Sequence, residues 1–143
     1  MTANASSTKS FARHLPAIAR VLLGLLFFVF GLNGFLNFIP TPPKDAMPAG
    51  LVAFSEAMMK TGYLFQLVKG TEVIVGLLLL LNRFVPLALV VLAPVIVNIV
   101  AVHAFLAPSG LVMGVVILAL ELYLAWAYRS AYRGMLAARA TPG

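Results

Sequence analysis

The chain contains no cysteine and carries very little charge. Only four of its 143 residues are acidic and ten are lysine or arginine, so charged residues make up 10% of the sequence, against roughly 25% in soluble domains. The missing cysteine excludes disulfide bonds, thiolate metal sites and dithiol redox centres within this chain. Hydrophobic residues make up 62% of the chain, which is more than a soluble domain of this length can bury. The composition therefore favours a protein that lies in lipid.

The net charge of +6 does not indicate a nucleic-acid partner. The basic residues lie between apolar blocks, and no basic run is interleaved with aromatic residues, as a nucleic-acid interface would require. Such a distribution is typical of a bilayer protein that faces anionic lipid headgroups.

Four apolar blocks, at about 17–39, 62–81, 84–107 and 110–128, approach the roughly 20 residues that a helix needs to cross a bilayer. The first block is too long for the apolar part of a signal peptide, so we expect it to be retained. The predicted fold is all-α, a four-helix transmembrane bundle. It divides the chain into a flexible cytoplasmic N-terminal tail (1–16), a membrane domain (17–133) and a cytoplasmic C-terminal tail (134–143).

The long connection between the first and second spans has amphipathic spacing. Leu51, Phe54 and Met58 fall on one helical face, whereas Glu56 and Lys60 are spaced to form an i,i+4 ion pair. This pattern predicts a short interfacial helix on the outer surface. An ordinary connector and a lid over a site are both consistent with it.

Lysine and arginine placement predicts the orientation in the membrane. With the N-terminus inside, two basic residues of the loops lie outside, Lys44 and Lys60, and seven lie inside: Lys9, Arg13, Arg20, Arg83, Arg129, Arg133 and Arg139. The bias predicts a multi-pass protein of the bacterial inner membrane with both termini cytoplasmic.

Polar side chains within membrane spans are costly, and they therefore indicate functional positions. The candidates for a ligand or proton site are Asn33, Gln66, Lys69, Glu72, Asn98, His103 and Glu121. At about 1.5 Å of rise per residue, Glu72 and Glu121 lie about 13 and 15 Å below the outer helix ends, and the other candidates also lie in the outer half or at the midplane. The inner halves of the spans lack such residues, so the pattern predicts a polar chamber that opens outward.

Charge counting within this chamber predicts a proton site. Lys69 supplies one positive charge, while Glu72 and Glu121 supply two negative charges, which should not both persist in a low dielectric. Either one carboxyl group holds a proton or His103 becomes protonated. The same cluster could instead fix only the packing of the helices.

Other polar and small residues have structural interpretations. A lone histidine at a helix end is more often a hydrogen-bonding group than a metal ligand, so no metal site is expected. Asn33 and Gln66 are expected to bond between helices, and glycines 24, 31, 34, 70 and 76 to mark close helix contacts. No nucleophile elbow, phosphate loop or haem attachment motif occurs.

The stretch Lys-Gly-Thr-Glu at 69–72 resembles the DoxX family of small bacterial membrane proteins. Similarity extends over residues 19–34, 78–88, 108–110 and 121–126, and it covers about residues 17–133. The resemblance implies a four-helix membrane bundle and an association with quinol oxidase or thiosulfate:quinone oxidoreductase subunits. Distant relatives resemble cargo receptors or assembly chaperones.

The leading hypothesis is a redox-linked membrane protein that binds quinone, with no covalent cofactor. Lys69 would contact the headgroup, Glu72 or Glu121 would manage a proton, and Asn98 would orient the ligand. One alternative is a non-catalytic scaffold or assembly partner of a membrane complex, with oxidoreductase subunits or a second copy of the chain beside it. The other alternative is a small-solute transporter.

Overall fold

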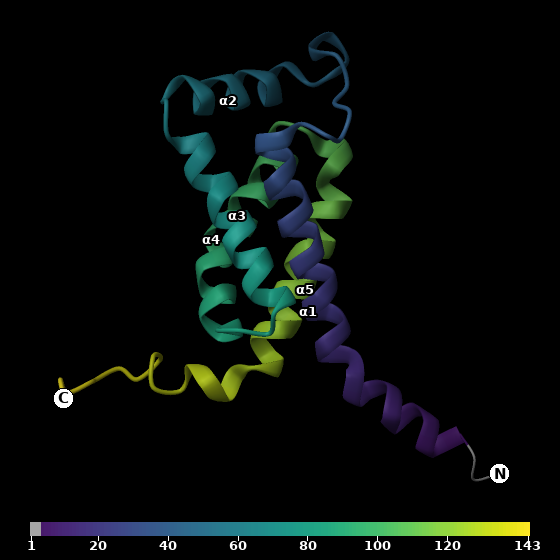
Figure 1. Ribbon diagram of the computed structural model, residues 1–143, viewed down its shortest axis with the longest axis vertical. Coiled ribbons are helices and arrows are strands. Elements are labelled where there is room, and N and C mark those ends of the chain that lie inside the picture. Colours follow the sequence, from purple (N-terminus) through teal and green to yellow (C-terminus); the bar gives the residue numbers. More distant parts are fainter. Residues whose placement is uncertain (1–3) are drawn as a thin grey trace.

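The computed structural model describes the backbone of residues 4–143 and the side chains of residues 11–143. The described residues are all-helical and contain no strand (Figure 1). Five α-helices follow one another along the chain: α1 (Asn4–Leu36), α2 (Ala49–Lys60), α3 (Leu64–Leu80), α4 (Val85–Phe105) and α5 (Leu111–Ala127). Three short 3-10 turns, η1 (Lys44–Ala46), η2 (Pro108–Gly110) and η3 (Arg129–Tyr132), complete the described elements.

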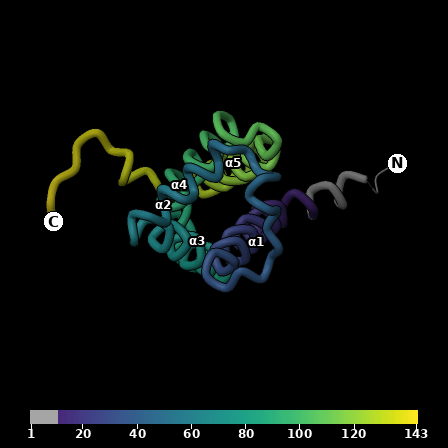
Figure 2. Tube along the Cα trace, turned by 90° about the horizontal axis from the view of Figure 1, so that it is seen from above, coloured from purple at the N-terminus to yellow at the C-terminus, as the bar shows by residue number. Residues whose placement is uncertain are grey.

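Helices α1, α3, α4 and α5 form a ring in which each helix packs against the next (Figure 2). The contact between α1 and α3 is the most extensive, and α5 closes the ring against α1. Helix α2 crosses one end of this ring, and the beginning of α1 and the C-terminus lie at the opposite end (Figure 1). Fully buried leucines, including Leu23, Leu79, Leu92 and Leu124, form the apolar core between the helices.

Glycines allow the backbones of α1 and α3 to lie in close contact. A β-carbon at Gly76 of α3 would lie 2.8 Å from the Cα of Phe28 and 2.9 Å from the carbonyl oxygen of Gly24. Backbone atoms cannot move aside as a flexible side chain can, so only glycine fits at position 76. The close contacts expected from the sequence are therefore present at Gly24 and Gly76. The expectation is wrong for Gly70, which has no heavy atom within 4 Å of the site of a β-carbon.

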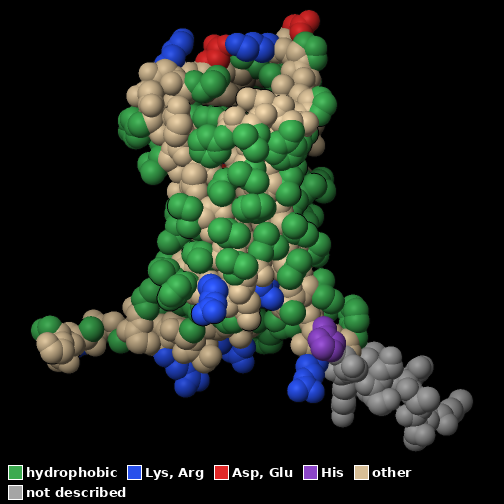
Figure 3. Space-filling model, viewed as in Figure 1, with side chains coloured by type: hydrophobic (Ala, Val, Ile, Leu, Met, Phe, Trp, Pro, Cys, Tyr) green, Lys and Arg blue, Asp and Glu red, His purple; other side chains and the backbone are tan. Residues whose placement is uncertain are grey.

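Three helical segments are long and apolar enough to cross a membrane: Phe11–Leu36, Val85–Phe105 and Pro108–Ala127. Helix α3 has 17 residues, and it meets the same test only together with α2, from which it is bent by 95°. On the face shown in Figure 3, hydrophobic side chains form a belt over the middle of the molecule, whereas basic side chains gather toward its two ends and the visible acidic ones lie at the end crossed by α2. Exposed large hydrophobic residues lie along α1, α3, α4 and α5. Lipid is the solvent that such a belt requires.

The observed helix ends differ from the predicted spans, most of all in α1. This helix begins at Asn4, within residues assigned from the sequence to a flexible tail, because a helix can continue past the apolar stretch that crosses the lipid. Residues 1–3 of that predicted tail lie outside the described residues. The helix ends at Leu36, since Asn37 has a positive φ of 49° and the backbone N–H of Ile39 donates to Asn33 Oδ1 at 2.7 Å.

The predicted helix between the first two spans is present as α2, but its charged residues pair differently. Lys44 Nζ lies 2.6 Å from Glu56 Oε1, so the ion pair expected between Glu56 and Lys60 is wrong. Lys44 lies in η1, just before α2. Its ammonium folds back onto the helix, a contact that spacing within the helix could not indicate. The hydrogen bond from Lys44, and then its charge, lowers the pKa of Glu56 below the ordinary 4.5.

Candidate functional site

An ion pair on α3 forms the centre of the candidate site. Lys69 Nζ lies 2.8 Å from Glu72 Oε2, and the two residues are three positions apart, so they share one face of the helix. The Glu72 side chain is 5% exposed and that of Lys69 is 24% exposed. A charged pair at such depth needs further polar partners or a ligand to offset the cost of removing it from water.

Two glycines of α1 create the space for this pair. A β-carbon at Gly31 would lie 3.0 Å from Glu72 Cβ, and one at Gly34 would lie 2.6 Å from Lys69 Cγ. Gly31 and Gly34 are spaced like Glu72 and Lys69, so the two small residues face the two charged residues across the α1–α3 contact. The ion pair is therefore positioned by α1 as well as by its own helix.

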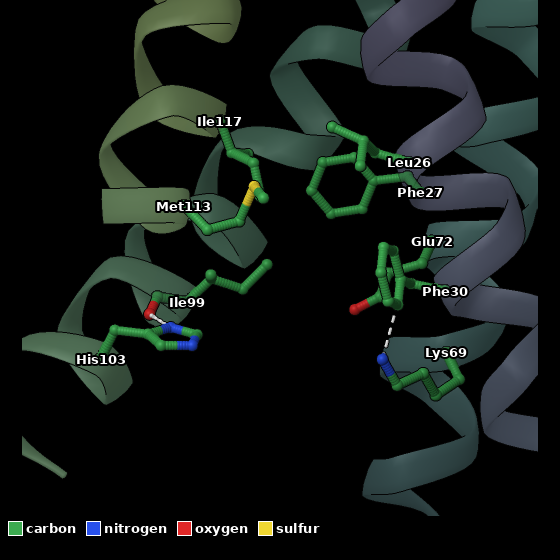
Figure 4. Close-up of a pocket in the computed structure, with 9 residues that line it drawn as sticks. All are labelled: Leu26, Phe27, Phe30, Lys69, Glu72, Ile99, His103, Met113 and Ile117. Carbon is green, nitrogen blue, oxygen red and sulfur yellow. Dashed lines mark hydrogen bonds and ion pairs between the residues drawn. The ribbon is translucent and has the colours of Figure 1, made fainter. Parts of the chain in front are cut away.

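A cavity of about 290 Å³ lies beside the ion pair, and all four helices of the ring contribute to its wall. Figure 4 shows Lys69 and Glu72 on one side and His103 on the other, with aromatic and aliphatic side chains around them. The apolar part of the wall consists of Leu26, Phe27, Phe30, Ile99, Met113 and Ile117. A mostly apolar cavity with a few polar groups is typical of a small-molecule site.

His103 faces this cavity in a fixed orientation. Its Nδ1–H donates a hydrogen bond of 2.8 Å to the carbonyl oxygen of Ile99. Because a carbonyl can only accept, a neutral ring oriented in this way carries its proton on Nδ1. Gly110 lies against the same ring, since a β-carbon there would be 2.6 Å from Nε2. These two contacts hold the imidazole across the cavity from the ion pair.

A neighbouring cavity of about 170 Å³ lies beneath α2. It shares Lys69, Glu72, Ile99 and His103 with the first cavity, and Asn98 also lines it. Its cover is the face of α2 that carries Leu51, Phe54, Ser55 and Met58. The apolar stripe noted in the sequence thus faces the cavity. We name the two adjoining cavities together the outer chamber.

The other sequence candidates lie apart from the ion pair. Asn33 stabilises the end of α1, where its side-chain oxygen accepts a hydrogen bond from the backbone N–H of Ile39. Gln66 is exposed and lines neither cavity of the outer chamber. Asn98 is exposed but contributes to the cavity beneath α2. Of the seven candidates, the chamber thus brings together Lys69, Glu72, Asn98 and His103.

Glu121 lies in a different place. Glu121 is 5% exposed. It lines a third cavity, of about 220 Å³, between α4, α5 and the segment that follows α5. Lys69 is paired with Glu72 and does not reach Glu121. The Oε2 atom of Glu121 is buried without a hydrogen-bond partner among the described residues.

Apolar residues of the chamber wall were missed from the sequence. Phe27, Phe30 and Met113 line the cavity, but within an apolar span nothing distinguishes a lining residue from one that faces lipid. The described residues contain no cluster of three or more His, Cys, Asp or Glu side chains that could hold a metal ion.

The apolar helices, the hydrophobic belt and the chamber together define a multi-pass membrane protein. The sequence model of the DoxX family matches residues 15–104, and the chain belongs to that family. The match runs from α1 almost to the end of α4, and it therefore includes the ion pair and His103 but not Glu121. No curated protein and no solved structure matches the chain.

Proposed function

We propose that the chain is a four-helix transmembrane bundle of the bacterial cytoplasmic membrane with both termini on the cytoplasmic side. In this arrangement α3 crosses the membrane together with α1, α4 and α5. The basic residues of the described chain support it, because the end opposite α2 holds the start of α1, the α3–α4 connection and the segment after α5, which carry Arg13, Arg20, Arg83, Arg129, Arg133 and Arg139. Lys9 lies outside the residues whose side chains are described.

The same proposal assigns to the outer chamber the binding of a quinone-like molecule. The observation that carries it is the sharing of Lys69, Glu72 and His103 by two adjoining cavities with apolar walls. A quinone has a flat, apolar ring with carbonyl oxygens at opposite edges, and these become hydroxyl groups in the quinol. The neutral His103 ring has an acceptor at Nε2, so it matches a hydroxyl group of the quinol, whereas the Lys69 ammonium matches an oxygen of either form. The Lys69 ammonium can donate to one oxygen, and His103 lies across the cavity from it (Figure 4).

Proton handling follows from the same groups. Reduction of a quinone takes up two electrons and two protons, and oxidation of the quinol releases them. Glu72 and His103 are the titratable groups beside Lys69 in the chamber wall, and each can exchange a proton with a bound quinol. The electrons would pass to or from a neighbouring membrane oxidoreductase subunit, the kind of partner that the family resemblance favours.

Binding of menadione to the purified protein in lipid nanodiscs tests the proposal. Lys69→Met should weaken binding by roughly tenfold, since a hydrogen bond to a charged group contributes about 1.5–3 kcal/mol. Glu72→Gln, which removes the partner that positions Lys69, and His103→Phe, which removes the polar group across the cavity, should also weaken binding. Thr71→Val is the matched control, because Thr71 lies between the paired residues and donates its hydroxyl to the carbonyl oxygen of Leu67. It does not line either cavity of the outer chamber.

Two results would contradict quinone binding: no saturable binding of menadione, or equal affinity in all four variants. In the second case, stoichiometric recovery of a membrane partner with all four variants would favour a scaffold role instead.

A further inference from the structure

The third cavity surrounds Glu121 with apolar side chains. Its wall is formed by α4 and α5 and by the segment after α5, through Leu89, Val90, Ala93, Ala125, Tyr132, Met135 and Leu136. Tyr132 is the only titratable side chain in this wall besides Glu121. The nearest ammonium of the outer chamber, that of Lys69, is already held by Glu72. The Glu121 carboxyl group is thus buried without a cation.

The segment after α5 is held in place over this carboxyl group. The Tyr132 hydroxyl donates to the carbonyl oxygen of Pro86 at 3.1 Å, which ties η3 to the first turn of α4. Met135 and Leu136 follow one turn later and form the edge of the cavity. Both remain more than half exposed, at 61% and 75%, so this edge of the cavity is open rather than sealed within the protein.

An ionised carboxylate in such surroundings is very unfavourable. Transfer of an unpaired charge into an apolar environment costs far more than protonation of the group at neutral pH. Burial of the protonated carboxyl group costs less free energy, because only the hydrogen bonds of a neutral polar group are then missing. The geometry therefore selects the neutral acid.

We propose that Glu121 is a second proton-binding site, separate from the outer chamber, and that it is held as a neutral carboxylic acid reachable from outside the protein through this open edge. The inference does not depend on quinone binding, because none of the residues around Glu121 lines the outer chamber.

A hydrophobic carbodiimide, dicyclohexylcarbodiimide, reports this state chemically. The carboxyl proton moves to one nitrogen of the reagent while the carboxyl oxygen bonds to the central carbon, and the adduct rearranges to a stable acylurea with no leaving group. The product gains the full mass of the reagent. Treatment of the protein in nanodiscs at neutral pH should therefore add one reagent, which peptide mass spectrometry should locate at Glu121. Glu72, held by Lys69, should remain unlabelled.

Three comparisons make the test specific. Glu121→Gln should lose the label. Labelling of the native chain should fall about tenfold for each pH unit above the ionisation midpoint of Glu121. Leu136→Lys should abolish labelling, since an ammonium at the cavity edge would stabilise the carboxylate, whereas Ala140→Lys, beyond the cavity, should not. Thermal unfolding of each variant in detergent confirms that it is folded.

The proposal is overturned by an unlabelled Glu121 in the folded native chain, or by labelling that is equal at Glu72 and Glu121. Because Glu121→Gln retains the shape of the side chain, it should also leave menadione binding unchanged. Loss of menadione binding alone would contradict the proposed function and leave the assignment of Glu121 intact.

Discussion

Gly34 of α1 leaves the space that the side chain of Lys69 fills. A β-carbon at Gly34 would lie 2.6 Å from Lys69 Cγ and 2.7 Å from Cδ, in the aliphatic part of the side chain that carries the paired ammonium. At Gly31 a β-carbon would lie 2.9 Å from the backbone N of Val73 and 3.0 Å from Glu72 Cβ, so Gly31 lets α1 approach the backbone of α3 beside Glu72. Close packing of α1 on α3 and the position of the ion pair are therefore one structural feature. Substitutions in α1 should affect the chamber without touching a charged residue.

Gly34→Ala should disturb the site more than the fold. The added methyl group meets a flexible side chain, so Lys69 can shift and the backbones need not separate. We expect menadione binding to weaken severalfold while the unfolding free energy changes by less than about 1 kcal/mol. Gly70→Ala is the control, because nothing lies within 4 Å of its β-carbon position. Equal binding by the two variants would show that Gly34 does not position Lys69.

Gly76→Ala should have the opposite effect. Its β-carbon would meet backbone atoms of Phe28 and Gly24, so α1 and α3 would have to separate. Overpacking costs about 1–3 kcal/mol, and a clash with backbone atoms belongs at the upper end of this range. It therefore outweighs the gain of about 1 kcal/mol in helix propensity from glycine to alanine. Unfolding in SDS–detergent mixtures should show the loss for Gly76→Ala and none for Gly70→Ala. A Gly76→Ala protein as stable as the native one would contradict the close backbone contact.

The sequence predicted the apolar helices, because long apolar runs have only one solvent that suits them. It also grouped Lys69, Glu72 and His103, and these residues line one cavity of the structure. Height along a helix follows from residue counting, but rotation about the helix axis depends on packing with neighbours. Glu72 and Glu121 were therefore placed at similar depths, about 13 and 15 Å, whereas the structure gives them different cavities.

Contacts between a helix and a neighbouring loop could not be predicted from the sequence either. Spacing within a helix favoured Glu56 with Lys60, yet the turn η1 brings Lys44 to Glu56. Asn33 was interpreted as a partner between helices, and it instead bonds the chain that leaves α1. In each case the backbone path of a connection decided the contact, and hydrophobic periodicity carries no information about that path.

The Lys44–Glu56 pair should contribute to stability in a pH-dependent way. The pKa of Glu56 is lowered in the folded chain, first by the hydrogen bond from Lys44 and then by its charge. The stabilising contribution is therefore present above the ordinary pKa of 4.5 and is lost as the pH falls through the lower, folded value. The contribution should be small, since the pair is exposed to solvent.

Lys44→Met should return the pKa of Glu56 toward its ordinary value, as followed by carboxyl NMR titration. Lys60→Met should change it less, because Lys60 acts only through its charge and is the smallest contributor. A larger shift on loss of Lys60 than on loss of Lys44 would contradict the observed ion pair.

The crossing of the membrane by α3 can be tested with single cysteines, because the native chain has none. Three helices meet the spanning criteria alone, and a fourth span requires that α3 crosses with α2 bent away from it. Lys60→Cys, Arg83→Cys, Ser109→Cys and Arg139→Cys sample the connections and the C-terminal segment. A membrane-impermeant maleimide added to intact spheroplasts labels only the cysteines that face outward.

If α3 crosses, positions 60 and 109 should be labelled and positions 83 and 139 protected until the membrane is permeabilised. If α2 and α3 both remain outside, positions 60, 83 and 139 should be labelled and position 109 protected. The two arrangements differ at three of the four positions, so one experiment separates them. The positive charge of Arg83 and Arg139 favours the first pattern, because basic residues are retained on the cytoplasmic side. Labelling at position 83 would contradict the proposed four-helix transmembrane bundle and, with it, the proposed opening of the outer chamber from within four membrane-spanning helices.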